Sequence, residues 1–157
     1  MKNYSVTADR FDLTYKELEP LYRQHFAERK ARYDAEGIQS GEYNPQLDTY
    51  FDYAQRGILV TFIARDGVAP IGYSNIYIVN DMHDGERIAQ EDAIYVLPQH
   101  RGTGAGDFLV RFVHAYMKEQ KVKRLNITTS TDLKVANWLK KHGYKHTAHC
   151  MMISFQE

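Results

Sequence analysis

The stretch Ile94–Gly106 constrains the fold most, because an extended segment passes there directly into a helix. Four apolar residues end at Pro98, and three glycines follow at alternate positions: Gly102, Gly104 and Gly106. Glycine lets a backbone turn tightly, so the amide groups of this turn can point inward at the start of the next helix. Free amides at a helix N-terminus bind phosphate, and Arg101 adds donors that suit a pyrophosphate.

The spacing of these glycines separates the segment from two better-known phosphate motifs. No Lys-Ser/Thr pair follows the last glycine, as a nucleotide-binding P-loop requires, and the dinucleotide fingerprint spaces its last glycines differently. An ordinary glycine turn is the alternative. The strand before the turn, Arg101 and the helix after it together favour a phosphate cradle.

Length and composition indicate one globular domain over residues 1–157. Hydrophobic residues make up 43% of the chain and charged residues 25%, which argues against disorder. The strongest apolar run, Ile58–Ala64, is too short for a bilayer, and Met1–Asn3 opens no signal peptide. A lone cysteine, Cys150, fits a reducing compartment. We therefore expect a cytoplasmic protein without a membrane segment.

Apolar spacing and turn residues predict the order of elements. The first part of the chain reads as a weak strand, a main helix that starts near Glu19 with Pro20 in its first turn and closes at Gly37, and a second helix from an Asn44–Pro45 N-cap to Arg56. Strands at 58–65 and 71–79 then flank a hairpin turn at Asp66–Gly67.

The second part of the chain alternates strands and helices. We expect a strand at 87–97, a helix at about 104–120, a strand at 124–129, a helix at 132–142 and a last extended segment at 144–155. This order predicts a mixed α/β domain of α+β character, with helices on both faces of a central sheet.

Two phrases of the sequence resemble the GNAT superfamily of acyl-CoA-dependent N-acetyltransferases. Arg101–Gly106 fits the family's Arg/Gln-x-x-Gly-x-Gly/Ala hallmark, and Tyr95–Pro98 sits at its strand end. Asp132–Tyr144 resembles the family's late helix with its closing Gly-Phe/Tyr. The resemblance implies a mostly antiparallel twisted sheet with one splayed parallel pair. It also implies acetyl transfer from acetyl-CoA to a primary amine, of a small molecule or a protein, by direct attack in a ternary complex.

The same resemblance assigns the cofactor contacts. The backbone of Tyr95, Val96 and Leu97 would pair with the pantetheine arm, and the pyrophosphate would be held by Arg101, Gly102, Thr103, Gly104, Ala105 and Gly106. Asp107 departs from the family, which more often has a neutral or basic residue there. Its carboxylate favours the helix dipole, but it should point away from a pyrophosphate.

Glu91 and Asp92 are the candidate bases, since an attacking amine must lose a proton. Strand alternation places them on opposite faces, so one of them should reach the acceptor. The family often carries its base on this strand, together with a bulge that upsets alternation. We favour Glu91 slightly over Asp92. A solvated or ion-paired carboxylate is the alternative for each.

The proton donor to the leaving thiolate is less defined. Many family members place a tyrosine four residues before the late glycine, where this chain has Leu139. Tyr144 is our candidate replacement, with Tyr95 or a water as alternatives. His25 and Glu28 share a helix face near the acceptor side and are candidate substrate contacts, with ordinary helix surface as the alternative.

No metal site is expected. His146 and Cys150 would share one face of a strand while His149 points to the other, which does not suit zinc. Cys150 is most simply a thiol of the core.

The neutral formal charge conceals an asymmetry. Residues 1–98 hold 10 Lys and Arg against 16 Asp and Glu, and residues 99–157 hold 10 against 4, so −6 and +6 meet at the phosphate cradle. The basic half suits an anionic cofactor and the acidic half a cationic amine. Two rival functions are a catalytically silent acyl-CoA-binding module and a transferase acting on a nucleic-acid-linked amine. The second conflicts with the mixed charges of the first helix. A homodimer is left open.

Overall fold

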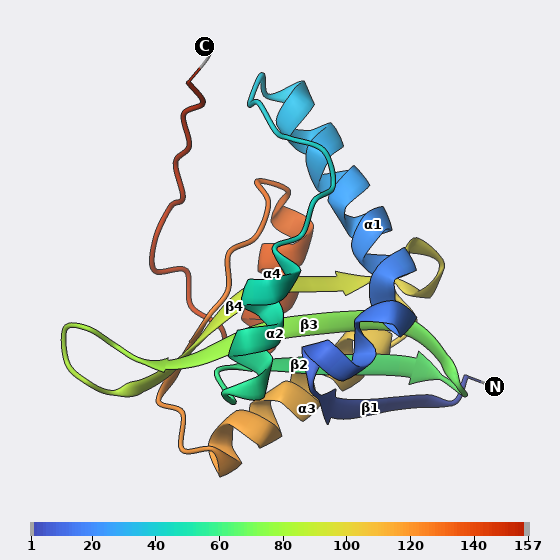
Figure 1. Ribbon diagram of the computed structural model, residues 1–157, viewed down its shortest axis with the longest axis vertical. Helices are drawn as coiled ribbons and strands as arrows, with labels where there is room; N and C mark the ends of the chain where they lie inside the picture. The colour runs from blue at the N-terminus through green and yellow to red at the C-terminus, as the bar shows by residue number, and fades with distance from the viewer. Residues whose placement is uncertain (1, 156–157) are drawn as a thin grey trace.

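The computed structural model describes residues 2–155 as one five-stranded sheet with helices on both faces (Figure 1). The strands are β1 (Tyr4–Asp9), β2 (Leu59–Asp66), β3 (Ala69–Asn80), β4 (Arg87–Val96) and β5 (Arg124–Asn126). The helices are α1 (Phe11–Ala35), α2 (Leu47–Gln55), α3 (Ala105–Glu119) and α4 (Leu133–Lys141), with a short 3₁₀ turn at Pro98–His100. The mixed α/β prediction is confirmed.

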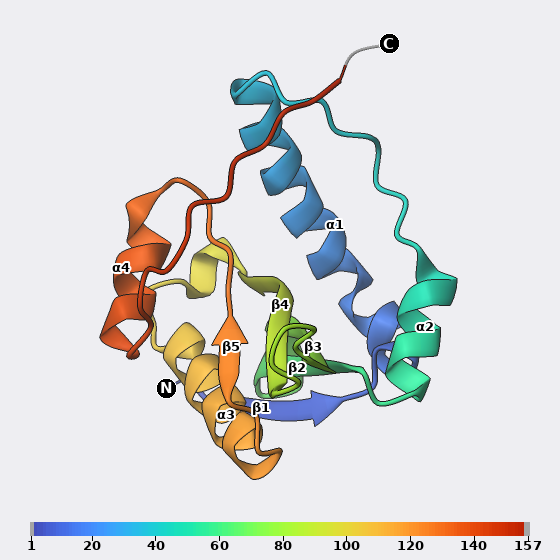
Figure 2. The same cartoon turned by 90° about the vertical axis from the view of Figure 1, so that its left-hand side faces the viewer.

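The strands lie in the order β1-β2-β3-β4-β5, antiparallel except for the β4–β5 pair. The parallel pairing joins only Ile88–Gln90 to Arg124–Asn126. Beyond Gln90 the two elements separate, as Figure 2 shows. The splayed parallel pair is therefore present, and the second half of β4 has an edge that β5 does not cover.

Two cores cover the two faces of the sheet. Side chains of α1 and α2 pack on one face with a mostly aromatic core, which includes Phe11, Leu18, Tyr22, Tyr73 and Tyr95. Side chains of α3 pack on the other face with Phe62, Ile76, Leu109, Val113 and Met117. This arrangement confirms the prediction of helices on both faces. Strand β4 has one side toward each core, and its second half also has an open edge.

A β-bulge at Asp92 divides β4. Ile76 of β3 pairs with Glu91 and Asn75 pairs with Ala93, which leaves Asp92 without a partner. Simple alternation would put Ala89 and Ala93 on one face, yet Ala89 packs in the α3 core and Ala93 against the α1–α2 core. The extra residue thus reverses the alternation.

The first helix begins eight residues earlier than the expected start near Glu19, because α1 runs from Phe11 straight through Pro20. Proline costs a backbone hydrogen bond and bends a helix, and the ribbon of α1 changes direction in its first part (Figure 1). Burial of Phe11, Leu18 and Leu21 outweighs this local cost.

Three other boundaries differ from expectation. The second helix starts at Leu47, with Gln46 rather than Asn44 as its N-cap, and β5 ends at Asn126 instead of 129. Residues 144–155 form no strand at all. Cys150 is exposed in this segment, so the expected core thiol is wrong. A run of apolar residues, Met151–Ile153, is also exposed, because this segment pairs with no strand of the sheet.

The late helix agrees with the sequence. The side chain of Asp132 caps α4 by accepting a hydrogen bond from the backbone amide of Lys134 at 2.9 Å. Within residues 2–155, no helix is long and apolar enough to cross a membrane.

Candidate active site at the opening between β4 and β5

Glu91 lies where β4 and β5 begin to separate. Its side chain is on the α3 face of β4 and the residue is only 8% exposed. Burial, and secondly the charge of Asp92, raise the pKa of the Glu91 carboxyl to about 8, and a hydrogen bond from the backbone of Thr128 opposes the shift. A carboxyl group with this pKa can exchange a proton near neutral pH, as a general base must.

Asp92 lies on the opposite face, among tyrosines of the α1–α2 core. Its Oδ2 accepts a hydrogen bond from the Tyr50 hydroxyl at 2.9 Å. Asp92 is exposed as a residue, yet the protein around its carboxylate removes enough water to raise its pKa, against the effect of the Tyr50 hydrogen bond. Burial and the Asp92 charge raise the pKa of Tyr77 to about 12. The two carboxylates therefore face opposite sides, as alternation predicted.

Tyr144 follows α4 and returns to the Glu91 side. Its hydroxyl shares a hydrogen bond of 2.8 Å with Nε2 of His114 on α3. Burial raises the pKa of the Tyr144 phenol, and the negative charge of Glu91 raises it further. Leu139, at the position where the family has its tyrosine, is a core residue at 4% exposure. Tyr144 is thus the hydroxyl that the structure brings near Glu91.

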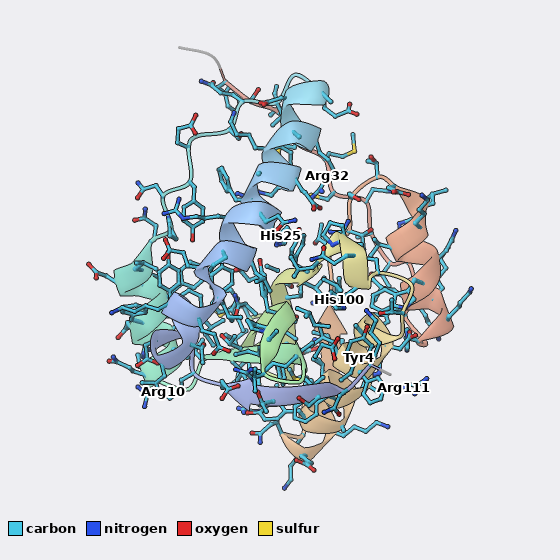
Figure 3. All side chains as sticks on the ribbon, turned by 90° about the vertical axis from the view of Figure 1, so that its right-hand side faces the viewer. Tyr4, Arg10, His25, Arg32, His100 and Arg111 are labelled. Atoms are coloured by element: carbon cyan, nitrogen blue, oxygen red, sulfur yellow. The ribbon has the colours of Figure 1, made fainter. Side chains whose placement is uncertain are left out.

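His25 and Glu28 both contact residues at the end of β4 from α1. His25 stacks on the Tyr95 ring, with 4.7 Å between centroids, and its Nδ1 lies 2.6 Å from the Tyr73 hydroxyl. Burial, and then the charges of Arg32 and Arg29, lower the pKa of His25 to about 4, so it is neutral at pH 7. Figure 3 shows His25 on α1, and the separate pair of His100 and Tyr4, whose ring centroids lie 6.2 Å apart.

Glu28 ties α1 to the glycine turn. It accepts hydrogen bonds from the Tyr95 hydroxyl at 2.7 Å and from Nη2 of Arg101 at 3.0 Å. Nε of Arg101 donates to the carbonyl of Val96 at 2.8 Å. The Arg101 guanidinium, which the sequence suggested for a pyrophosphate, therefore bonds to β4 and α1 instead. The backbone of Arg101 remains part of the glycine turn.

The glycine turn has the geometry of an anion cradle. Gly102 and Gly104 have φ angles of 72° and 95°, a left-handed backbone that favours glycine. Gly104 is the N-cap of α3 and has no side chain to accept from the first-turn amides. These donors point out of the helix start, where an anion would find them together with the positive end of the helix dipole.

The carboxyl end of β4 offers backbone groups beside this cradle. The Leu97 amide donates to Ile71 of β3 at 2.8 Å, so the backbone of Val96 faces the other way. Its carbonyl accepts from Arg101, and its amide is directed to the opening. The turn is anchored from below, since Thr103 Oγ1 donates to the His100 carbonyl and shares a hydrogen bond with the Tyr4 hydroxyl. An acyl-CoA fits these residues: an extended edge for the pantetheine arm leads to amide donors for the pyrophosphate.

Asp107 points away from the cradle, as expected for a carboxylate beside a pyrophosphate. Its Oδ1 accepts from the Trp138 indole at 2.8 Å and lies 2.6 Å from Nε2 of His142. Sequence reasoning missed His114, Tyr50 and this role of Trp138. The sequence did contain a hint for His114. It lies seven residues after Asp107, so the two side chains share one face of the helix.

No three His, Cys, Asp or Glu side chains among residues 2–155 are grouped so that they could hold a metal ion.

Comparisons with known proteins agree with this geometry. The family model described as "Acetyltransferase (GNAT) family" matches residues 15–144. The chain therefore belongs to the GNAT acetyltransferase family, whose members are acyl-CoA-dependent N-acetyltransferases, and acetyl-CoA is its co-substrate. A comparison with curated proteins finds no match.

Solved structures share the fold at low identity. A ribosomal-protein-alanine N-acetyltransferase from Brucella melitensis biovar Abortus 2308 has a TM-score of 0.70 at 17% identity, covering 99% of each chain. An aminoglycoside acetyltransferase from an uncultured soil metagenomic sample has a TM-score of 0.74 at 12% identity, covering 98% of this chain and 99% of that one. The aminoglycoside N-acetyltransferase AAC(6')-Iy in complex with CoA has a TM-score of 0.67 at 16% identity, covering 97% and 99%.

Proposed function

We propose that this acetyltransferase acts on a cationic primary amine, of a small molecule or of a protein, by direct attack in a ternary complex at the β4–β5 opening. One observation carries the proposal. The opening has a buried carboxyl of raised pKa at its closed end, Glu91, and an uncapped helix N-terminus at the other, Gly104. Such an arrangement suits an anionic thioester and an amine that must lose a proton.

Acetyl-CoA supplies an activated acyl group when it is bound. Backbone groups of Tyr95, Val96 and Leu97 would hold its pantetheine arm. The pyrophosphate would lie on the turn residues, Arg101, Gly102, Thr103, Gly104, Ala105 and Gly106. The Arg101 guanidinium then serves to fix this turn against Glu28, since it is already bonded there.

Glu91 would act as the base. An amine has an ordinary pKa near 10.4 and is mostly protonated at neutral pH. Glu91 takes that proton and passes it to solvent, and the neutral nitrogen then forms its bond to the acyl carbon. As the carbon–sulfur bond breaks, the nitrogen gives its second proton to Glu91. Tyr144 gives its hydroxyl proton to the leaving sulfur while His114 holds the phenol oxygen. The proton on Glu91 then returns to Tyr144 through solvent, which restores both residues.

Asp92 faces the other side of the sheet from Glu91, so it would bind a second cationic group of the acceptor and not the reacting amine. Its carboxylate is partly shielded from water and is held by Tyr50, and the ring of Tyr77 lies in the same cluster. A carboxylate beside aromatic faces attracts an organic cation by charge and by cation–π contact. His25 and Glu28 would shape this side indirectly, through Tyr73 and Tyr95.

The acceptors of similar proteins set the range to test. Aminoglycosides and a ribosomal-protein alanine terminus are the acceptors that the names of two similar structures give. The acidic first part of this chain favours a polycationic acceptor of either kind. Separately, we expect the reaction to take place in the cytoplasm.

The test is release of free CoA thiol from acetyl-CoA across a panel of aminoglycosides, polyamines and alanine-terminated peptides. Turnover with one class identifies the acceptor and excludes a silent binding module. Binding of CoA with no turnover on any amine would overturn the catalytic proposal.

The cofactor site is tested by calorimetry on Gly104→Asp, which puts a negative charge at the N-cap of α3. Binding of CoA should be lost. Gly67→Asp is the matched control, because Gly67 also has a positive φ, 61°, with open space around it at the β2–β3 hairpin. Unchanged CoA affinity in Gly104→Asp would place the pyrophosphate elsewhere.

A further inference from the structure

The last residue of the phosphate cradle rests on an indole ring. A Cβ atom added at Gly106 would lie 3.1 Å from one ring carbon of Trp138 and 3.4 Å from another. Gly106 has an ordinary helical backbone, so the indole, and not the φ angle, is what limits this position. Trp138 therefore forms a wall directly behind the cradle.

Hydrogen bonds to Asp107 fix the position of this indole. Asp107, in the first turn of α3, accepts from Trp138 Nε1 at 2.8 Å and from His142 Nε2 at 2.6 Å through the same oxygen. Trp138 and His142 also meet edge to face, with 5.2 Å between ring centroids. Both belong to the end of α4, so one carboxylate joins α4 to the start of α3.

Little else attaches α4 at this point. Leu139 is the buried residue of α4, and the helix is only nine residues long. Short helices depend on tertiary contacts for their stability. The hydrogen bonds from Trp138 and His142 to Asp107 therefore help to fix the position of the indole. The indole in turn contacts Gly106 and limits how its backbone can move.

These bonds also explain an acidic residue beside an anion site. The hydrogen bonds from Trp138 and His142 lower the pKa of Asp107, so it stays ionised. A negative charge in the first turn would repel a diphosphate, but this oxygen is turned to two donors of α4.

We propose that Asp107, Trp138 and His142 are positioning residues that hold the cradle at Gly106 in shape for the diphosphate of acetyl-CoA. The inference rests on the proposed cofactor site. It assigns these side chains a role in binding the phosphates and none in the chemistry of transfer.

A pair of variants at one position separates the acceptor oxygen from its charge. Asp107→Asn keeps an oxygen for the indole and removes the charge, so CoA affinity should hold or rise. Asp107→Ala removes the oxygen, and we expect affinity to fall about tenfold because the cradle shifts. Trp138 is the chain's single tryptophan, so its fluorescence reports binding in both variants, with calorimetry as a second measurement. Equal affinity in both variants would overturn the proposal.

A shortened donor tests whether the role concerns the phosphates. Acetyl-pantetheine lacks the diphosphate, so Asp107→Ala should raise KM for acetyl-CoA and leave kcat/KM with acetyl-pantetheine unchanged. His146→Gln, at an exposed histidine, is the control for general effects. A parallel loss with both donors would indicate a merely structural role and contradict the inference.

A double-mutant cycle tests the contact itself. Gly106→Ala should weaken CoA binding about tenfold in the parent chain, because its methyl group meets the indole. It should cost less in Trp138→Phe, whose smaller ring leaves room. Equal costs in both backgrounds would refute the contact's role. Failure of the unmodified protein to bind CoA would contradict the proposed cofactor site itself. Binding by the unmodified protein with no difference among the variants would contradict only the role of Asp107, Trp138 and His142.

Discussion

Glu91 and Asp92 are neighbours in sequence, but they differ in exposure, in hydrogen-bond partners and in the face of the sheet that they occupy. Glu91 is buried at the end of the β4–β5 opening, and its pKa is raised to about 8. Asp92 is exposed on the aromatic α1–α2 side, where Tyr50 donates to it. Alternation along β4 presents one carboxyl group to each core, and the bulge leaves Asp92 without a partner on β3. A buried carboxyl suits proton transfer, whereas an exposed one suits the capture of a cation.

The largest expected effect is on the buried side. Glu91→Gln removes the base and should lower kcat by about 10²–10⁴-fold, measured as thiol release at saturating amine. In the parent enzyme the rate should rise with pH up to about 8, as Glu91 loses its proton, and then level off. That limb should vanish in the variant. A wild-type rate and profile in Glu91→Gln would remove the proposed distinction between the two carboxylates.

The exposed side should change binding instead of rate. Asp92→Asn should raise KM for a cationic acceptor about tenfold, since a charge-assisted contact is worth about 1.5–3 kcal/mol, and leave kcat within about threefold. Tyr50→Phe, which removes only the hydroxyl that holds Asp92, should shift KM in the same direction and less. A large fall in kcat in Asp92→Asn would make Asp92 the base.

The burial of Glu91 should also make the stability of the fold depend on pH. Folded Glu91 keeps its proton up to about pH 8, whereas the ordinary value is 4.5, so the folded state binds more protons between these values. Stability therefore falls as pH rises through this window. Glu91→Gln should unfold about 2–4 °C above the parent at pH 9 and show a smaller gain at pH 5. Thermal denaturation followed by circular dichroism measures both; a constant difference would contradict the burial of an ionisable Glu91.

His25 should make the smallest contribution to the pH dependence of stability, and in the direction opposite to that of Glu91. It stays neutral in the fold down to about pH 4, against an ordinary value of 6.5, so the unfolded state binds more protons between these values. Stability is therefore lost as pH falls through that range. His25→Gln keeps a polar partner for Tyr73 and should lose about 1–2 °C less than the parent between pH 7 and pH 5. An identical loss in both proteins would show that His25 is not buried uncharged.

The sequence predicts this molecule best where the structure is decided locally. The hairpin at Asp66–Gly67, the three long strands and the glycine turn depend on neighbouring residues, and all are found as expected. The start of α1 was missed because the cost of Pro20 is local while burial of Phe11 depends on α2 and the sheet.

The site shows the same limit. The opposite faces of Glu91 and Asp92 follow from alternation, but the bulge beyond them depends on β3 and has no signal of its own in the sequence. Tyr144 could be named as a candidate, whereas its partner His114 comes from another helix. The last segment, 144–155, has strand-like residues without a strand, because pairing depends on a neighbouring edge.

The short pairing of β4 with β5 has a consequence for the life of this protein in a cell. Unpaired strand edges are templates for association with other chains, and this sheet has one after Gln90, at the opening where we propose the active site. If the pantetheine arm pairs with that edge, acetyl-CoA acts as a removable sixth strand. The metabolic supply of acetyl-CoA would then govern how long the enzyme persists as well as how fast it works, because a ligand that binds only the folded state protects it.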